Sequence, residues 1–175
     1  AQGVDLAPFA PANAAVAVRW TSHMDPVLGQ PLKGVAFRAG AMTARGEAVI
    51  SARGLEGGGV YAISRAVREG HTLFVDLRPD LTRAEIAARL SRPRGKASLA
   101  NHLRKTLKLS GAPAALLREC AHPLPVEPEA LAARIKALEI PHDGLCPIDE
   151  AISTAGGVRR AARQGEGGNQ HAERE

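Results

Sequence analysis

Residues 31–59, PLKGVAFRAGAMTARGEAVISARGLEGGG, decide the fold class of this chain. Residues 32–37 and 48–51 are rich in aliphatic, aromatic and β-branched side chains, which favour β-strands. Between them, Arg45-Gly46-Glu47 has the composition of a turn, so the stretch predicts a β-hairpin. The glycine-rich run 54–59 then ends the extended structure.

On either side of this hairpin the sequence continues with short elements. Downstream, the apolar residues of 60–67 recur at helical spacing up to Gly70, and residues 71–77 have the composition of a strand. Upstream, residues 1–30 contain three prolines and one short alternating stretch, 14–20, that is typical of a half-buried strand. We expect residues 1–30 to be a segment of a larger folded unit rather than to form a compact unit by themselves.

The following segment is predicted to be helical. Thr82-Arg83-Ala84-Glu85 is a capping box, in which the threonine hydroxyl and the glutamate carboxylate each accept a backbone N–H. Pro113 and Pro128 stand near the starts of two further apolar periodic runs, where proline is tolerated. Four helices are predicted, over residues 83–90, 98–109, 114–120 and 127–138. After Pro141 the chain is irregular, and residues 151–154 form a further strand.

These elements predict an α+β fold, with a small β-barrel-like unit, a cluster of about four helices and a return strand. Residues 161–175 are poor in apolar side chains and dense in Gly, Gln, Glu and Arg, so we expect a disordered tail. The expected units are a leading segment 1–30, a domain 31–148 (β unit 31–77, helical part 82–140), a return segment 149–160 and the tail 161–175.

Composition narrows the class of protein. Hydrophobic residues make up 45% of the 175 residues, yet no apolar run reaches the ~20 residues that span a bilayer. The beginning of the sequence lacks the basic and apolar regions of a signal peptide, so we expect a cytoplasmic protein with no membrane partner. The net charge of +5 raises the question of nucleic acid, but the basic half has no aromatic side chains on which bases could stack. We therefore do not expect nucleic acid as a partner.

Few residues carry an obvious chemistry. The glycine run 54–59 could cradle a phosphate, but it matches neither GxGxxG nor a P-loop, and Glu56 would repel an anion, which favours a structural turn. The basic loop 91–96 is typical of an exposed surface. Thr154-Ala155-Gly156-Gly157-Val158 allows close approach of a backbone, and a bend or packing contact is the simpler interpretation. No histidine pair has metal-ligand spacing, and no catalytic constellation can be defended.

Several strings nevertheless resemble one protein family, in the right order over roughly residues 3–160. The strings are Leu6-Ala7-Pro8-Phe9, Pro11-Ala12-Asn13, Gly29-Gln30-Pro31-Leu32-Lys33, Arg53-Gly54-Leu55-Glu56-Gly57, Tyr61-Ala62-Ile63-Ser64 and Ala151-Ile152-Ser153-Thr154-Ala155-Gly156-Gly157-Val158. They are similar to the BaiN-like (aminoacetone-oxidase-like) NAD(P)/FAD-dependent flavoproteins. In such proteins a Rossmann FAD domain is interrupted by an insert, part barrel-like and part helical, before the chain returns to the flavin.

The resemblance implies that this chain is the insert domain, with its flanks, of an FAD-dependent oxidoreductase. It implies that Thr154, Gly156 and Gly157 flank the flavin, with Gly54 and Gly57 as weaker cofactor-binding candidates. Glu56 stands where many relatives have serine. No catalytic or metal-binding residue is implied.

The departures from the family pattern set a further expectation. The GxGxxG turn that binds the diphosphate of a dinucleotide is absent from the sequence, as is the later AGE-type segment. We therefore expect a partial chain that neither binds FAD nor is active by itself. A separately encoded Rossmann FAD domain could complete the flavin site. A frameshift that replaced the C-terminal segment would explain the tail. The rival hypothesis is a stand-alone basic binding module for protein or nucleic acid, so whether the chain is an enzyme stays open.

Overall fold

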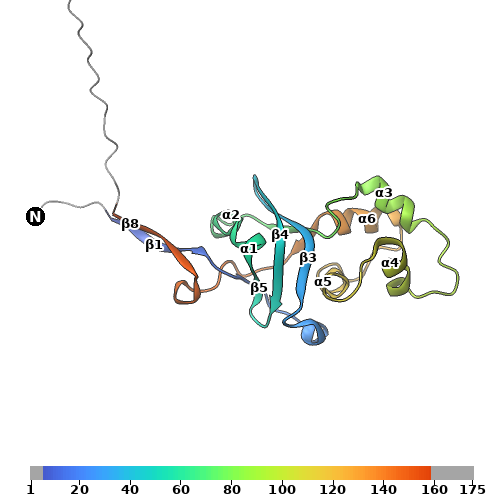
Figure 1. Cartoon of the computed structure of the whole chain (residues 1–175), viewed down its shortest axis with the longest axis horizontal. Helices are drawn as coiled ribbons and strands as arrows, with labels where there is room; N and C mark the ends of the chain where they lie inside the picture. The colour runs from blue at the N-terminus through green and yellow to red at the C-terminus, as the bar shows by residue number, and fades with distance from the viewer. Residues whose placement is uncertain (1–5, 159–175) are drawn as a thin grey trace, which may run out of the picture.

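The computed structural model of the chain describes residues 6–158. Its central element is an antiparallel six-stranded sheet in the order β2-β5-β4-β3-β6-β7, which curls into half a barrel (Figure 1). The strands are β2 (Val16–Ala17), β3 (Pro31–Ala39), β4 (Met42–Ser51), β5 (Gly54–Glu56), β6 (Leu73–Asp76) and β7 (Leu138–Ile140). Two short helices, α1 (Gly58–Tyr61) and α2 (Ser64–Arg68), follow β5, and α1 packs against β4.

Four longer helices form one end of the molecule (Figure 1). They are α3 (Arg83–Leu90), α4 (Leu99–Leu107), α5 (Ala112–Cys120) and α6 (Pro128–Lys136). The predicted capping box is confirmed at the start of α3: Thr82 Oγ1 accepts the Glu85 N–H at 3.2 Å, and Glu85 Oε2 accepts the Thr82 N–H at 2.8 Å. Lys136 ties this helical unit to the sheet, because its Nζ pairs with Asp76 at 2.5 Å and donates to the Leu81 carbonyl at 2.8 Å.

At the opposite end a two-stranded ribbon projects from the body (Figure 1). It consists of β1 (Leu6–Asn13) and β8 (Ser153–Val158), which pair antiparallel. Two short 3-10 helices, η1 (Ser22–Val27) and η2 (Ile148–Glu150), complete the described structure.

One continuous core joins the sheet to both groups of helices. Its largest fully buried side chains include Phe37, Met24, Ile50, Leu73 and Leu107. Residues 14–30 contribute to it through Val16, Val18, Met24 and Val27. The predicted α+β fold with a barrel-like unit and about four helices is confirmed. Within the described residues, no helix has the length and apolarity to cross a membrane.

The predicted hairpin exists, but the position of its turn was wrong. The chain reverses at Gly40, whose φ is +54°, whereas Arg45-Gly46-Glu47 lies inside β4. Gly46 is needed for another reason: a Cβ there would lie 3.1 Å from the Cα of Gly59, because the start of α1 packs closely on β4.

Other element boundaries also differ from the predictions. The helix predicted over 60–67 is two short helices separated at Ala62 and Ile63, and the run 54–59 does not end extended structure, since β5 occupies its first half. Leu138, predicted to extend the fourth helix, lies in β7, which pairs with β6. The return strand continues through both glycines of β8 rather than bending at them. The predicted disordered tail, 161–175, lies outside the described residues.

Candidate functional site at the base of the ribbon

The segments that lead into and out of the domain run side by side. Ala17 donates to the Gly144 carbonyl and accepts from Asp143, both at 2.9 Å, and Cys146 donates to the Ala15 carbonyl at 2.8 Å. At the point where the ribbon begins, the Ile152 N–H bonds to the Asn13 carbonyl at 2.8 Å. The two segments are therefore held together by backbone hydrogen bonds where they join β1 and β8.

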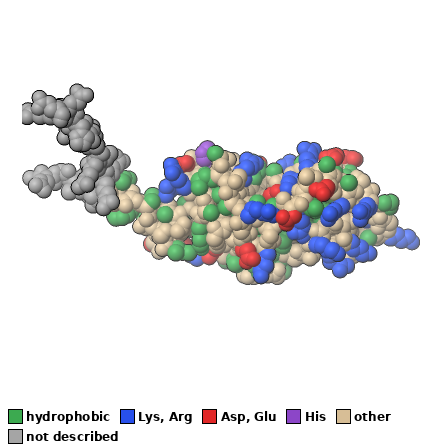
Figure 2. All heavy atoms as spheres, turned by 45° about the horizontal axis from the view of Figure 1, so that its top comes forward, with side chains coloured by type: hydrophobic (Ala, Val, Ile, Leu, Met, Phe, Trp, Pro, Cys, Tyr) green, Lys and Arg blue, Asp and Glu red, His purple; other side chains and the backbone are tan. Residues whose placement is uncertain are grey.

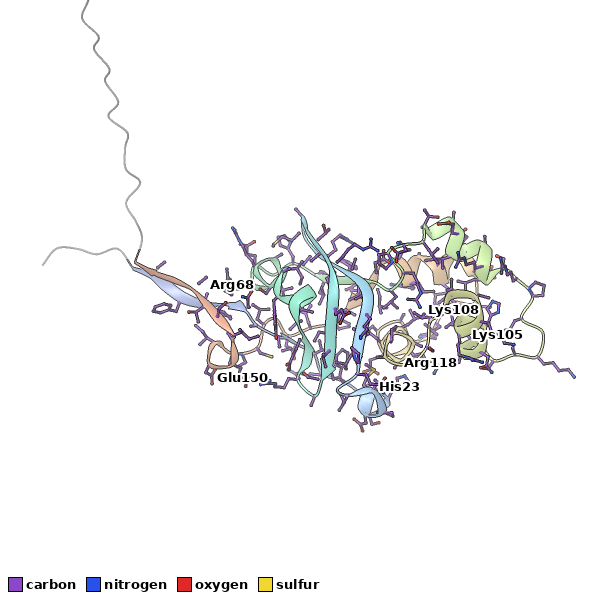
Figure 3. All side chains as sticks on the ribbon, in the orientation of Figure 1. His23, Arg68, Lys105, Lys108, Arg118 and Glu150 are labelled. Atoms are coloured by element: carbon purple, nitrogen blue, oxygen red, sulfur yellow. The ribbon has the colours of Figure 1, made fainter. Side chains whose placement is uncertain are left out.

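Helix α2 holds one side of the ribbon's base. The Ser64 side chain is buried, with 1% of the residue exposed, and its hydroxyl donates to the carbonyl of Ala12. Arg68, one turn further along, donates from Nη1 to the Pro11 carbonyl at 2.5 Å. Figure 3 shows Arg68 beside the base of the ribbon, with Glu150 below it. Two consecutive carbonyls of β1 are thus fixed by side chains from the body of the domain.

An ion-pair network holds the other side. The Arg53 guanidinium, between β4 and β5, pairs with Glu150 of η2 and lies 3.4 Å from a carboxylate oxygen of Glu56. These two carboxylates, Glu150 first, raise the pKa of Arg53 above its ordinary value. Because Arg53 is more than half exposed, we treat the network as a positional restraint rather than a source of stability.

The predicted residues of β8 lie in the ribbon itself. Thr154 is exposed and pairs with Pro11, next to the carbonyl that Arg68 holds. Gly156 has φ +119°, and a Cβ there would lie 2.4 Å from the Pro8 carbonyl oxygen. Gly157, with φ +102°, pairs with Ala7. The two glycines therefore allow β1 and β8 to approach across an irregular register that a side chain would disrupt.

The other two predicted glycines lie in the body of the domain. Gly54 is buried in β5 with φ +143°, and a Cβ there would lie 2.0 Å from the Val16 carbonyl oxygen. Gly57, with φ +122°, precedes α1, and a Cβ there would lie 3.1 Å from the Glu47 carbonyl oxygen. Strand packing accounts for glycine at both positions. Helix α1, with four residues, is too short to offer a phosphate-binding terminus.

Sequence reasoning missed the side chains that position the ribbon. Ser64 was quoted as part of a family string, but its contact with Ala12 spans 52 residues of sequence. Arg53 likewise was quoted only as part of a family string, Arg68 and Glu150 belong to no sequence pattern, and Glu150 contacts Arg53 across 97 residues. Only the packing of α2 and η2 against the base of the ribbon reveals these residues.

Reactive side chains are scarce in the described part of the chain. It contains no group of three or more His, Cys, Asp or Glu residues that could hold a metal ion. Burial raises the pKa of the Cys120 thiol to about 12, and burial followed by the charge of Glu150 raises the pKa of Cys146. Both thiols are therefore protonated at neutral pH and are poor nucleophiles. The base of the ribbon offers backbone groups, a hydroxyl and fixed charges rather than catalytic side chains.

The comparison with known proteins matches the chain to one family model. A model described as HI0933-like protein barrel and H2TH domain covers residues 10–153. The match includes the half-barrel and the four-helix unit, beginning within β1 and ending at the first residue of β8. No curated protein matches the chain significantly.

Proposed function

This chain belongs to the HI0933-like protein family, whose full-length members are FAD-associated, and from that premise we propose that residues 10–153 act as an insert domain that covers a flavin site. The paired boundary segments carry this proposal. A domain inserted into another must begin and end at neighbouring points, and here residues 13–17 and 143–152 are hydrogen-bonded to each other. The ribbon that follows is suited to connect the insert to a flavin-binding domain.

Within this arrangement, we assign the contact with flavin to β8. Thr154 presents an exposed hydroxyl beside the carbonyl that Arg68 fixes, and Gly156 and Gly157 leave backbone groups uncovered by side chains. The strands are held at their base by Ser64 and Arg53, so the contact surface is positioned before a cofactor binds. Gly54 and Gly57 remain weaker candidates, since packing already explains them. We further propose that the chain belongs with the BaiN-like group, as the resemblance of its sequence strings implies.

When bound, the flavin would supply the redox chemistry, and the protein its position and surroundings. This chain's contribution is to orient the ribbon and to limit access to one face of the site. The sequence contains no GxGxxG turn, whose amides bind the diphosphate of a dinucleotide. We therefore propose that high affinity for FAD requires a Rossmann FAD domain in addition to residues 10–153, whether joined to it or encoded separately.

A labelling experiment tests the position of the contact. Thr154→Cys places a reactive thiol on the exposed ribbon, while the raised pKa values of Cys120 and Cys146 keep the native thiols unreactive. The chain, labelled there with a fluorophore, is mixed with FAD and an HI0933-like FAD domain produced separately. Lys105→Cys, at an exposed position of α4 at the far end of the molecule (Figure 3), is the matched control.

We expect flavin to quench the label at residue 154 strongly and the label at residue 105 hardly at all, because quenching requires close approach. Equal quenching at the two positions, or quenching of residue 105 alone, contradicts the proposal. Complex formation is followed independently by size-exclusion chromatography with absorbance in the flavin bands. If the two proteins form a flavin-containing complex without quenching at residue 154, the placement of the ribbon is wrong.

A further inference from the structure

A cavity lies at the helical end, away from the ribbon. It has a volume of about 270 Å³, is open to solvent on one side, and is lined by residues of α3, α4, the start of α6 and the loops 91–98 and 121–127. Its apolar wall includes Leu90, Leu99 and Leu131, one from each helix. The volume is slightly below the ~300–1,000 Å³ typical of sites for drug-sized ligands, so the cavity suits a molecule smaller than these ligands.

A buried imidazole forms part of the wall. His102 is 7% exposed, and its Nε2 lies 3.0 Å from the Leu90 carbonyl oxygen. A carbonyl only accepts hydrogen bonds, so Nε2 carries a proton, and in the tautomer protonated at Nε2 alone Nδ1 is an acceptor. Within residues 6–158, Nδ1 has no hydrogen-bond partner and is not fully enclosed. His102 therefore brings an unused acceptor, Nδ1, to a side chain that lines the cavity.

The α3–α4 side of the cavity is strongly positive, whereas the side formed by the start of α6 carries Glu127 and Glu129, of which Glu129 pairs with Arg83. Residues 86–118 contain eight Lys and Arg residues and no Asp or Glu. Of these eight, none forms an ion pair within the described residues. Figure 2 shows Lys and Arg side chains concentrated over this end of the molecule. One of them, Arg94, lines the cavity, where its planar guanidinium suits a carboxylate.

The cavity also exposes apolar surface that a ligand would cover. Val126, in the loop between α5 and α6, lines the cavity and is 92% exposed. Removing an apolar side chain from water is favourable, so an apolar ligand that covers Val126 gains binding free energy. Three chemical preferences therefore meet here: an apolar body, a negative charge and a hydrogen-bond donor.

We propose that this cavity binds a small amphipathic carboxylate that also carries a hydroxyl group. The apolar body packs on Leu90, Leu99 and Leu131, the carboxylate binds Arg94, and the hydroxyl donates to His102 Nδ1. Val126 covers the bound molecule. This site is separate from the ribbon and does not depend on the proposed flavin role.

The test uses the full chain and 4-hydroxyphenylacetate as the probe, with binding followed by NMR shifts of the backbone amides. Two matched compounds separate the contributions: phenylacetate lacks the hydroxyl, and tyramine carries an amine in place of the carboxylate. We expect phenylacetate to bind a few-fold more weakly, about the value of one neutral hydrogen bond, and tyramine not to bind. The largest shifts should occur at Leu99, His102 and Leu131.

Arg94→Gln should weaken binding of the probe about tenfold, since it removes a charge-assisted hydrogen bond. Arg92→Gln is the matched control, because it removes the same charge from the same loop without lining the cavity, and it should leave affinity nearly unchanged. The proposal is overturned if the probe produces no saturable shifts, if tyramine binds as well as the probe, or if the two arginine variants weaken binding equally.

Discussion

Replacing Gly54 with alanine tests whether the glycines of the half-barrel serve packing. The Cβ would lie 2.0 Å from the Val16 carbonyl oxygen and 2.7 Å from the Val18 nitrogen, both backbone atoms that cannot rotate away. Gly58→Ala is the matched control four residues further on, because a Cβ at Gly58 has no neighbour within 4 Å and its φ is not positive.

The expected cost of Gly54→Ala has two parts. Holding a non-glycine residue at φ +143° costs about 1–3 kcal/mol. Relief of the clash requires β2 to separate from β5, which breaks backbone hydrogen bonds such as Val18 N–H to the Arg53 carbonyl at 2.9 Å, each contributing roughly 1 kcal/mol. We expect a loss of about 3–5 kcal/mol, or roughly 10 °C in melting temperature for a domain of this size.

Urea unfolding followed by Trp20 fluorescence measures this loss. Trp20 is the sole tryptophan, and its indole Nε1 donates to the Ser51 carbonyl at 2.9 Å, next to the strand that Gly54 begins. Gly58→Ala should change the free energy of unfolding by less than about 1 kcal/mol, since alanine is favoured over glycine in a helix. If both variants unfold at the same urea concentration, the packing argument for Gly54 is wrong.

Three further results are expected. Gly156→Ala should increase hydrogen exchange at the Ile152 amide without changing global stability, because its Cβ would clash with Pro8 and Phe9, which both lie within the ribbon; unchanged exchange would contradict this. Lys136→Met should destabilise the fold by about 3 kcal/mol in urea, since it leaves the mostly buried Asp76 carboxylate unpaired. Cys120, with a pKa of about 12, should react with Ellman's reagent at pH 8 only on unfolding, and its contribution to stability should fall as pH rises from about 9 toward 12. Rapid reaction of the native thiol would refute the burial argument.

Interactions local in sequence were predictable, and those that span the chain were not. The capping box at Thr82 needs only four consecutive residues, and it forms as predicted. Gly46 reads as a turn in isolation, yet it serves the approach of Gly59, thirteen positions away. Likewise, β7 has only three residues, and its strand character arises from pairing with β6 across more than 60 residues.

The candidate site shows the same division. Residues 154–157 could be named as candidates in advance, because glycines mark places where the backbone is constrained. The sequence did not show that this constraint comes from the pairing of β8 with β1. The contacts of Ser64 and Arg68 with β1 depend on how α2 packs on the sheet, which no local pattern encodes. The cavity beside His102 likewise depends on the packing of three helices and two loops.

The most direct measurement is an FAD titration of this chain, first alone and then with an HI0933-like FAD domain, followed by flavin fluorescence. The central claim is that residues 10–153 cover a flavin site whose diphosphate is held by another domain. We expect no saturable binding by the chain alone, and a flavin-containing complex when the second domain is present. Tight, stoichiometric uptake of FAD by the chain alone would contradict the claim.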